Sequence, residues 1–402
     1  MSILERSKRA LLDVSIAYDG GLGSPHEAPI SEVSKNIDRI KSLHLSTTSP
    51  RIFHNFLVAA PELETLNIFS AEQPAELGFL FGGNLPALRS LVLAGLPSWP
   101  LGLFSNLKNL HLILPPSHPT TKVSSLIDIM SRSPGIERIK MGEFLSVTDD
   151  SPPSSLVHLP NLQKFTMYNC DSATVLSHTH TPATADIKVI IDHCKVGTMI
   201  GIPSHDRHIL YSVPGDMSTI GFLMESTTFA LQQDHKVGFG MGFYRSRSSQ
   251  PSLRVLACSP SIKSFARRSI EVLVNHPHHF RNIKDLYIAL SAGSTVPWSR
   301  LLQPFKQLER LGVIAIHVPS ILHALTVVGE DGHPTCPALK RLDFHEKADG
   351  HAVAVDEEGV VQFFAARRVL GCAVAEVNIE SLGGRRRLKR RDSGERTAGG
   401  RV

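Results

Sequence analysis

Histidine is the residue in this sequence with the widest capacity for chemistry, because imidazole transfers protons near neutral pH and ligates transition metals. The chain has 20 histidines among 402 residues. Three groups are close enough in sequence to be compared with metal sites: His178/His180 with His193/Cys194, His205/His208, and His276/His278/His279. None of these spacings matches an established zinc pattern, and the surrounding prolines and polar residues predict exposed loops. The sequence therefore predicts no metal ligands and no cofactor.

The motifs of nucleophilic and phosphate-transfer chemistry are also missing from the sequence. It contains no GxSxG, no Walker lysine in a glycine-rich loop and no Cys-His pair with an identifiable orienting residue. Gly238, Gly240 and Gly242 do not form GxGxxG, and their spacing favours a glycine-rich strand or turn over a phosphate site. We therefore expect no catalytic residues. The alternative is an enzyme built from the middle of the chain and its histidines, which metal analysis would test.

The C-terminal end carries a compact basic run. Its members are Arg385, Arg386, Arg387, Lys389, Arg390 and Arg391. Residues 385–402 hold eight basic and two acidic residues, a net charge of +6, so the rest of the chain has a net charge of −1 and the total is +5. Such runs serve in nuclear import or in loose contact with nucleic acid, and a plain solvated tail is the alternative. Residues 383–402 are rich in Arg, Gly, Ser and Asp and are predicted to be disordered.

A short motif of apolar residues, called the phrase below, recurs along the chain. The strands that it predicts would hold any binding residues in place. In residues 160–170 its apolar side chains are Leu162, Phe165 and Met167, at positions 1, 4 and 6, with Cys170 at position 9. Further copies are Leu63/Leu66/Ile68, Leu88/Leu91/Leu93, Leu107/Leu110/Leu112, Ile136/Ile139/Met141, Ile283/Leu286/Ile288, Leu308/Leu311/Val313 and Leu339/Leu342/Phe344. Such a recurrence is typical of leucine-rich repeats, whose strands bury their apolar edges only by stacking. The predicted fold is an α/β leucine-rich-repeat solenoid with parallel strands on the concave face and helices and loops on the convex face. Unrelated amphipathic strands are the alternative.

The phrase divides the predicted solenoid, residues 1–382, into three regions: N-terminal repeats over 1–176, an irregular insert over 177–250, and C-terminal repeats over 251–382. Looser copies lie at Ile40/Leu43/Leu45, Leu253/Leu256 and Val374/Val377/Ile379. Alternating Leu12, Val14 and Ile16 predict an opening strand, and strands are also expected at Ile187–Ile191 and Lys236–Phe243. Helices are expected at Val123–Met130, Ser320–Val328 and from the N-cap Asp356 to Leu370.

The residues between the apolar positions should point to the concave face, where many repeats contribute to one surface. Over nine copies these positions hold ten Lys or Arg and five Asp or Glu. Candidate partner-binding residues are Lys41, Arg89, Lys108, His111, Arg138, Lys140, Lys164, Lys284, Tyr287, Arg310 and Arg341. The excess of cations favours an acidic or phosphorylated protein target. Ordinary solvated strand positions are the alternative.

Composition limits the remaining classes of function. Apolar residues make up 42% of the chain, yet no stretch approaches the roughly 20 consecutive apolar residues of a membrane span. The opening residues lack the layout of a secretory signal, so we expect a cytoplasmic or nuclear protein without membrane contact. Five widely spaced cysteines, an odd number, predict reduced thiols and no disulfide framework.

The arrangement resembles the leucine-rich-repeat region of fungal (basidiomycete) F-box proteins. The residues that carry the resemblance are the opening 4–7, the strand 12–16, and 336–342, which is similar to a late CP-x-L-x-x-L repeat of that family. The resemblance implies a substrate receptor of a cullin-type ubiquitin ligase, with the repeats holding the target and an F-box holding a Skp-type adaptor. The F-box itself is expected upstream of Met1, so the adaptor is expected only if that domain has been truncated and not lost. A nucleic-acid-associated or nuclear protein acting through its basic tail is the alternative.

Overall fold

The computed structural model describes residues 7, 10–18, 27–70, 80–83, 85–94, 105–113, 123–142, 156–168, 172–192, 226, 228–234, 238–244, 253–258, 280, 282–289, 296–314, 317–329, 332–345, 356–381 and 384–389. The chain divides into two compact units, Met1–Phe222 and Leu223–Val402. The charged residues before the opening strand also predict a helical start of the chain; of residues 1–9 the structure describes only residue 7.

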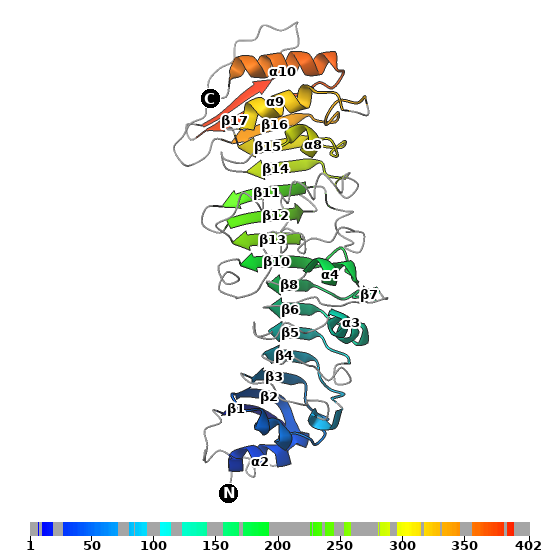
Figure 1. Ribbon diagram of the computed structural model, residues 1–402, viewed down its shortest axis with the longest axis vertical. Helices are drawn as coiled ribbons and strands as arrows, with labels where there is room; N and C mark the ends of the chain where they lie inside the picture. Colours follow the sequence, from blue (N-terminus) through cyan, green and yellow to red (C-terminus); the bar gives the residue numbers. More distant parts are fainter. Residues whose placement is uncertain are drawn as a thin grey trace, which may run out of the picture. The chain divides into compact units, whose positions relative to one another are not determined.

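The first unit contains a sheet in which strands that follow one another in the chain are also neighbours in space. In sheet order the strands are β1 (Leu12–Tyr18), β2 (Ile40–Thr47), β3 (Thr65–Ser70), β4 (Ser90–Ala94), β5 (Asn109–Ile113), β6 (Arg138–Gly142), β8 (Lys164–Tyr168) and β10 (Asp186–Asp192). Each neighbouring pair is parallel. Figure 1 shows these strands side by side in chain order. The unit is therefore a mixed α/β structure around an eight-stranded parallel sheet.

The apolar positions of the phrase form ladders across this sheet. Position 4 residues are paired in register from Leu43 to Phe165, and position 6 residues from Leu45 to Met167. All of these side chains are at most 3% exposed. Before the strand, the amide of the position 1 residue donates to a carbonyl three residues back, as in Leu162 to Leu159 at 3.2 Å. The same turn precedes Leu63, Leu88, Ile136, Leu162, Ile283, Leu308 and Leu339, which explains why one spacing of apolar residues recurs.

The first unit also contains helices and short helical turns. In this unit they are α2 (Glu27–Lys35), α3 (Val123–Arg132), α4 (Ser172–Ser177) and the short 3-10 turns η1 (Ile37–Arg39), η2 (Pro50–Asn55) and η3 (Leu80–Gly83). The helix expected at Val123–Met130 is confirmed by α3, whose Leu126, Ile129 and Met130 are fully buried. Strands β7 (Val157–His158) and β9 (Thr179–His180) form a separate two-stranded parallel sheet.

Strand β10 shows that the ladder continues past residue 176, so the irregular insert predicted for 177–250 does not begin there. Ile187 and Val189 pair in register with Phe165 and Met167, and both are at most 1% exposed. The sequence pattern missed this copy because it is one residue shorter. Its turn residue is Ala185, 1% exposed, which stands two residues before Ile187 where other copies have three.

The second unit combines antiparallel and parallel pairing. In sheet order its strands are β13 (Leu253–Cys258), β12 (Gly238–Tyr244), β11 (Thr228–Asp234), β14 (Asp285–Ala289), β15 (Arg310–Ile314), β16 (Arg341–His345), β17 (Glu376–Ser381) and β18 (Gly384–Lys389). The pairs from β11 to β17 are parallel. Strand β12 is antiparallel to both β11 and β13, and β13 contains the weak copy at Leu253/Leu256.

Three described helices accompany this sheet: α8 (Trp298–Leu302), α9 (Val318–Thr326) and α10 (Glu357–Val369). The expected helices at Ser320–Val328 and Asp356–Leu370 are therefore confirmed within two residues at their ends. Asp356 is the N-cap of α10, and its carboxylate accepts from the Glu358 amide at 3.0 Å. Among the helices that the structure describes, none combines the length and apolar character needed to cross a membrane.

The predicted disorder of residues 383–402 is wrong for Gly384–Lys389, which form β18 antiparallel to β17. The physical reason is that β17 offers an edge of unpaired backbone groups, and backbone pairing along an edge does not depend on side-chain type. A run of arginines contains no sequence signal for such pairing. Residues 390–402 lie outside the described part of the chain.

Candidate interaction surface

The polar face of each sheet consists of the side chains that point away from the apolar ladders, because successive side chains of a strand alternate between faces. We name its rows by position in the phrase: row 2 lies just before the strand, and rows 3 and 5 lie on it. Row 5 of β5, β6, β8 and β10, for example, holds His111, Lys140, Thr166 and Lys188 in register. All of the predicted partner-binding residues belong to these three rows.

Row 2 of the first unit is a series of exposed ion pairs. Lys41 lies 3.5 Å from a Glu64 oxygen, and Lys108 lies 3.2 Å from a Glu137 oxygen. Arg89, between these pairs, donates to the carbonyl of its neighbour Leu88 at 3.2 Å. Lys41 and Lys108, although predicted as binding residues, therefore already have carboxylate partners.

The second unit has the same arrangement in row 2. Glu309 lies between two lysines, 2.9 Å from Lys340 and 3.8 Å from Lys284. Its pKa is lowered, first by the hydrogen bond from Lys340 and then by that lysine's charge. The predicted binding residue Lys284 is thus also partly neutralised within its own row.

The charged residues differ on β5, β6, β8 and β10, where a basic cluster forms: His111, Arg138, Lys140, Lys164 and Lys188. Arg138 is beside Lys164 in row 3, and His111 is beside Lys140 in row 5. Arg138, Lys140 and Lys164 are exposed, whereas His111 and Lys188 are half-buried. Within the described residues, none of the four Lys and Arg side chains has an ion pair, even though Asp186 is in register with Lys164. This cluster therefore brings four cations without ion pairs in the described residues together on adjacent strands.

Tyr168 supports one edge of the basic cluster. The Lys140 ammonium lies 5.6 Å from the centroid of the Tyr168 ring, within range of a cation–π interaction. The neighbouring strand has Gly142 in register with Tyr168, so no side chain stands between the ring and β6. The aromatic face therefore holds Lys140 without removing its charge.

The charge of the neighbouring Lys140 affects the protonation of His111. Its pKa is lowered, first by burial and then by the positive charge of Lys140. The imidazole is therefore biased towards its neutral form, in which one ring nitrogen can still accept a hydrogen bond.

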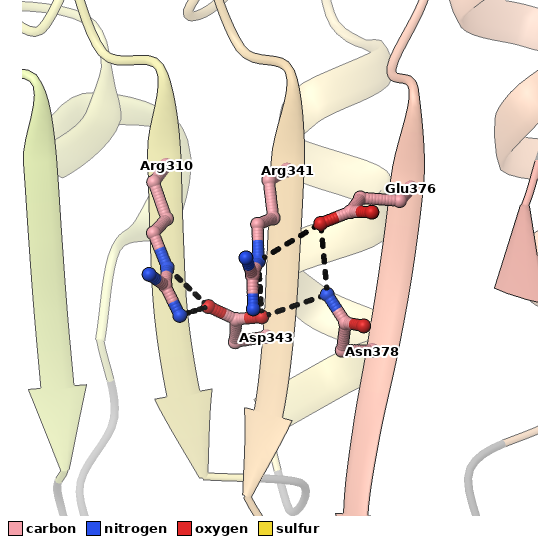
Figure 2. A network of polar contacts seen from close by, with 5 residues as sticks. All are labelled: Arg310, Arg341, Asp343, Glu376 and Asn378. Carbon is pink, nitrogen blue, oxygen red and sulfur yellow. Dashed lines mark hydrogen bonds and ion pairs between the residues drawn. The ribbon is translucent and has the colours of Figure 1, made fainter. Parts of the chain in front are cut away.

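The second unit places its arginines in a neutralised network, which Figure 2 shows. The Asp343 carboxylate, 1% exposed, accepts from Arg310 and from Arg341, the latter at 2.8 Å. Asn378 donates to the same carboxylate at 2.9 Å, and Glu376 lies 3.1 Å from Arg341. Arg310 and Arg341 were both predicted as binding residues. Arg310 is paired with Asp343, and Arg341 is paired with Asp343 and Glu376, so both arginines link neighbouring strands of the sheet.

Tyr287, the remaining predicted residue, packs across its neighbours. Its ring meets His345 edge to face, with centroids 5.3 Å apart. The strand between them has Gly312 in register, and a Cβ added there would lie 2.7 Å from the Tyr287 ring. Gly312 is therefore what allows Tyr287 to lie over β15 and reach β16.

The structure adds little on the other sequence candidates. The backbones of Arg385, Arg386, Arg387 and Lys389 are in β18, while Arg390 and Arg391 lie outside the described residues, so nuclear import stays a prediction. In the described part of the chain, no three or more His, Cys, Asp or Glu side chains are grouped to hold a metal ion. His193, Cys194 and the histidine groups at 205–208 and 276–279 are not described.

Sequence reasoning missed two contributors to the surface. Lys188 was overlooked because its repeat is one residue short, although the alternation Ile187/Val189 marks the strand. The cation–π role of Tyr168 depends on the register between β6 and β8, which the sequence alone does not give.

No protein-family model matches the chain, and no curated protein matches it significantly.

Proposed function

We propose that the chain is a leucine-rich-repeat solenoid that works as a non-catalytic protein-interaction module and binds an acidic segment of a protein target at the basic cluster. The repeated turn, the apolar ladders and the parallel order of β1 to β10 support the solenoid. In such an architecture each repeat adds a strip to one broad concave surface, which is the polar face described above.

The observation that carries the proposal is a contrast within one surface. Lys41 and Lys108 are compensated by neighbouring glutamates, whereas Arg138, Lys140 and Lys164 have no carboxylate partner in the described residues. Uncompensated cations on adjacent strands gain most from an anionic partner, because that partner need not displace an existing ion pair.

The resemblance to fungal F-box proteins suggests a cellular role for this interaction module. The module would be the substrate-recognition part of a ubiquitin-ligase receptor, and a Skp-type adaptor would join it through an F-box upstream. The target-binding role needs only the repeats, so it can be tested without the adaptor.

The test compares two triple variants with matched charge. Binding of a fluorescein-labelled oligoglutamate peptide is followed by anisotropy on the full chain at low salt. We expect the Arg138→Met/Lys140→Met/Lys164→Met variant to bind at least about tenfold more weakly, and Lys41→Met/Lys108→Met/Lys284→Met to bind like the parent. Equal loss in both variants would mean that only net charge matters, and unchanged binding in the first would place the site elsewhere.

A further inference from the structure

Two histidines that are distant in the sequence meet on the small sheet of β7 and β9. His158 and His180 are in register on these parallel strands. Their ring centroids lie 4.9 Å apart, and the ring planes are tilted by 36°. The sequence did not suggest this pair, because His180 is closer along the chain to His178 and His193 than to His158.

Both imidazoles lie on the outer face of this sheet. Val157 and Leu159 on one side of His158 and Thr179 next to His180 are at most 4% exposed, whereas the two histidines between them are exposed. This alternation is the ordinary consequence of strand geometry. Within the described residues, neither imidazole makes a hydrogen bond or an ion pair, so their ring nitrogens are available to a ligand.

The backbone under both histidines is fixed by other contacts. The Leu159 amide donates to the His180 carbonyl at 3.1 Å, which ties the two strands together beside the rings. Strand β7 contacts α3 and β9 contacts α4, where the Thr179 hydroxyl donates to the Val175 carbonyl at 2.7 Å. The two imidazoles are therefore held close together before any ligand binds, which is what a precise site requires.

The separation of the rings matches that of two imidazoles on one metal ion. A metal–nitrogen bond of about 2.1 Å added to an imidazole radius of about 1.2 Å places each centroid roughly 3.3 Å from the metal. For nitrogen–metal–nitrogen angles between roughly 90° and 109°, the centroids are then about 4.6–5.3 Å apart. The observed 4.9 Å lies within this range.

The ligand type and the local composition indicate which ions would bind. Imidazole nitrogen suits Zn²⁺, Cu²⁺ and Ni²⁺, whereas Mg²⁺ and Ca²⁺ prefer oxygen ligands. Residues 156–163 and 172–185, which carry the two histidines, contain no Lys or Arg that would repel a cation. Two protein ligands leave the other coordination positions to water, so the ion would be exchangeable and not locked in a closed structural site.

We propose that His158 and His180 together bind one divalent transition metal ion, such as Zn²⁺ or Cu²⁺. The inference is independent of the proposed function, because none of its residues belongs to the polar face. Strand β7 precedes β8 and β9 precedes β10, so the ion would link two neighbouring repeats through the segments that lead into their strands.

The first experiment measures amide hydrogen exchange of the full chain by mass spectrometry, with Zn²⁺ or with EDTA. Separation of β7 from β9 breaks the chelate, so a bound ion must slow exchange of the Val157 and Leu159 amides, which donate across these strands. At a Zn²⁺ concentration of about ten times the Kd, we expect exchange about tenfold slower. His158→Asn and His180→Asn should each abolish the effect, and the double variant should resemble either single one. The control His54→Asn changes another exposed histidine and should keep the effect.

The results decide the proposal in either direction. Exchange that is equal with Zn²⁺ and with EDTA would mean that the two rings make a ring contact only, which overturns the site. Slowing that persists in His158→Asn or His180→Asn would place the ion on other histidines and overturn it as well.

A second measurement needs no substitution and therefore does not depend on the folding of the variants. Cu²⁺ with ascorbate and hydrogen peroxide oxidises the imidazoles that bind the copper, and peptide mass spectrometry locates the 2-oxohistidine formed. We expect His158 and His180 to be oxidised at least about tenfold faster than His54, because Cu²⁺ binds imidazole more strongly than the other divalent ions of its series. Equal oxidation of all three histidines would contradict the site.

Discussion

Arg367 is expected to be one of the largest single contributors to the stability of the second unit. Its side chain is 0% exposed in α10 and donates to four backbone carbonyls: Leu325 at 3.0 Å, Thr335 at 2.6 Å, Cys336 at 2.8 Å and Cys372 at 3.0 Å. The guanidinium therefore joins the end of α9, the turn before β16 and the end of α10. Burial lowers its pKa, a sign of the desolvation that opposes this contact.

Two opposing effects set the magnitude of an Arg367→Met change. Hydrogen bonds to a charged group contribute about 1.5–3 kcal/mol each, so four are worth about 6–12 kcal/mol. Removing the charge recovers several kcal/mol of desolvation. Methionine fills much of the volume but leaves the carbonyls of buried residues such as Leu325 and Cys336 without a donor. The lost hydrogen bonds therefore outweigh the recovered desolvation free energy. We expect a net destabilisation of about 4 kcal/mol.

The assay is urea unfolding followed by tryptophan fluorescence in a Trp99→Phe background, so that the buried Trp298 is the indole that reports on the second unit. Arg368→Met is the matched control, since Arg368 is the next residue of α10 and is exposed. It should change stability by less than about 0.5 kcal/mol. Arg367→Lys should be intermediate, because one ammonium cannot reproduce the forked geometry. If Arg367→Met and its control differ by less than about 1 kcal/mol, the reasoning is refuted.

Three further changes test other parts of the structure by urea unfolding followed by far-ultraviolet circular dichroism, which reports on the strands and helices of both units. Leu110→Ala, at a side chain 1% exposed, should cost about 2–5 kcal/mol, and a cost below about 1 kcal/mol would mean that it does not belong to the ladder. Asp343→Asn removes the buried carboxylate between two arginines and should cost about 3–5 kcal/mol, so wild-type stability would contradict its central place. Gly312→Ala drives a Cβ into the Tyr287 ring and should cost about 1–3 kcal/mol; an unaltered midpoint would show that the ring moves aside freely.

The apolar ladders could be predicted from the sequence because they follow from a requirement that every copy shares. Leu66, Leu91 and Leu110 are all buried at the same position of neighbouring strands and pair in register, so their spacing repeats. The copy at β10 escaped because Ala185 is small and one residue is missing from its turn. A search for apolar residues at positions 1, 4 and 6 does not find a copy that is one residue shorter. The backbone still brings Ile187 and Val189 into register with Phe165 and Met167.

Charge pairing could not be predicted, because it depends on contacts between residues far apart in the sequence. Lys108 and Glu137 become partners only through the register of β5 and β6. Counting cations over the face therefore identified Arg138, Lys140 and Lys164 together with lysines that are already neutralised. Arg367 and Arg368 likewise look equivalent in sequence, and only the packing of α9 against α10 distinguishes the buried one from the exposed one.

The most direct test of the binding surface is to map where an acidic peptide lies on the full chain. An oligoglutamate peptide with a photoreactive diazirine, cross-linked and analysed by mass spectrometry, should label residues 138–142, 164–168 and 186–190. Labelling concentrated on 310–314 and 341–345, where the arginines are already neutralised, would contradict the account.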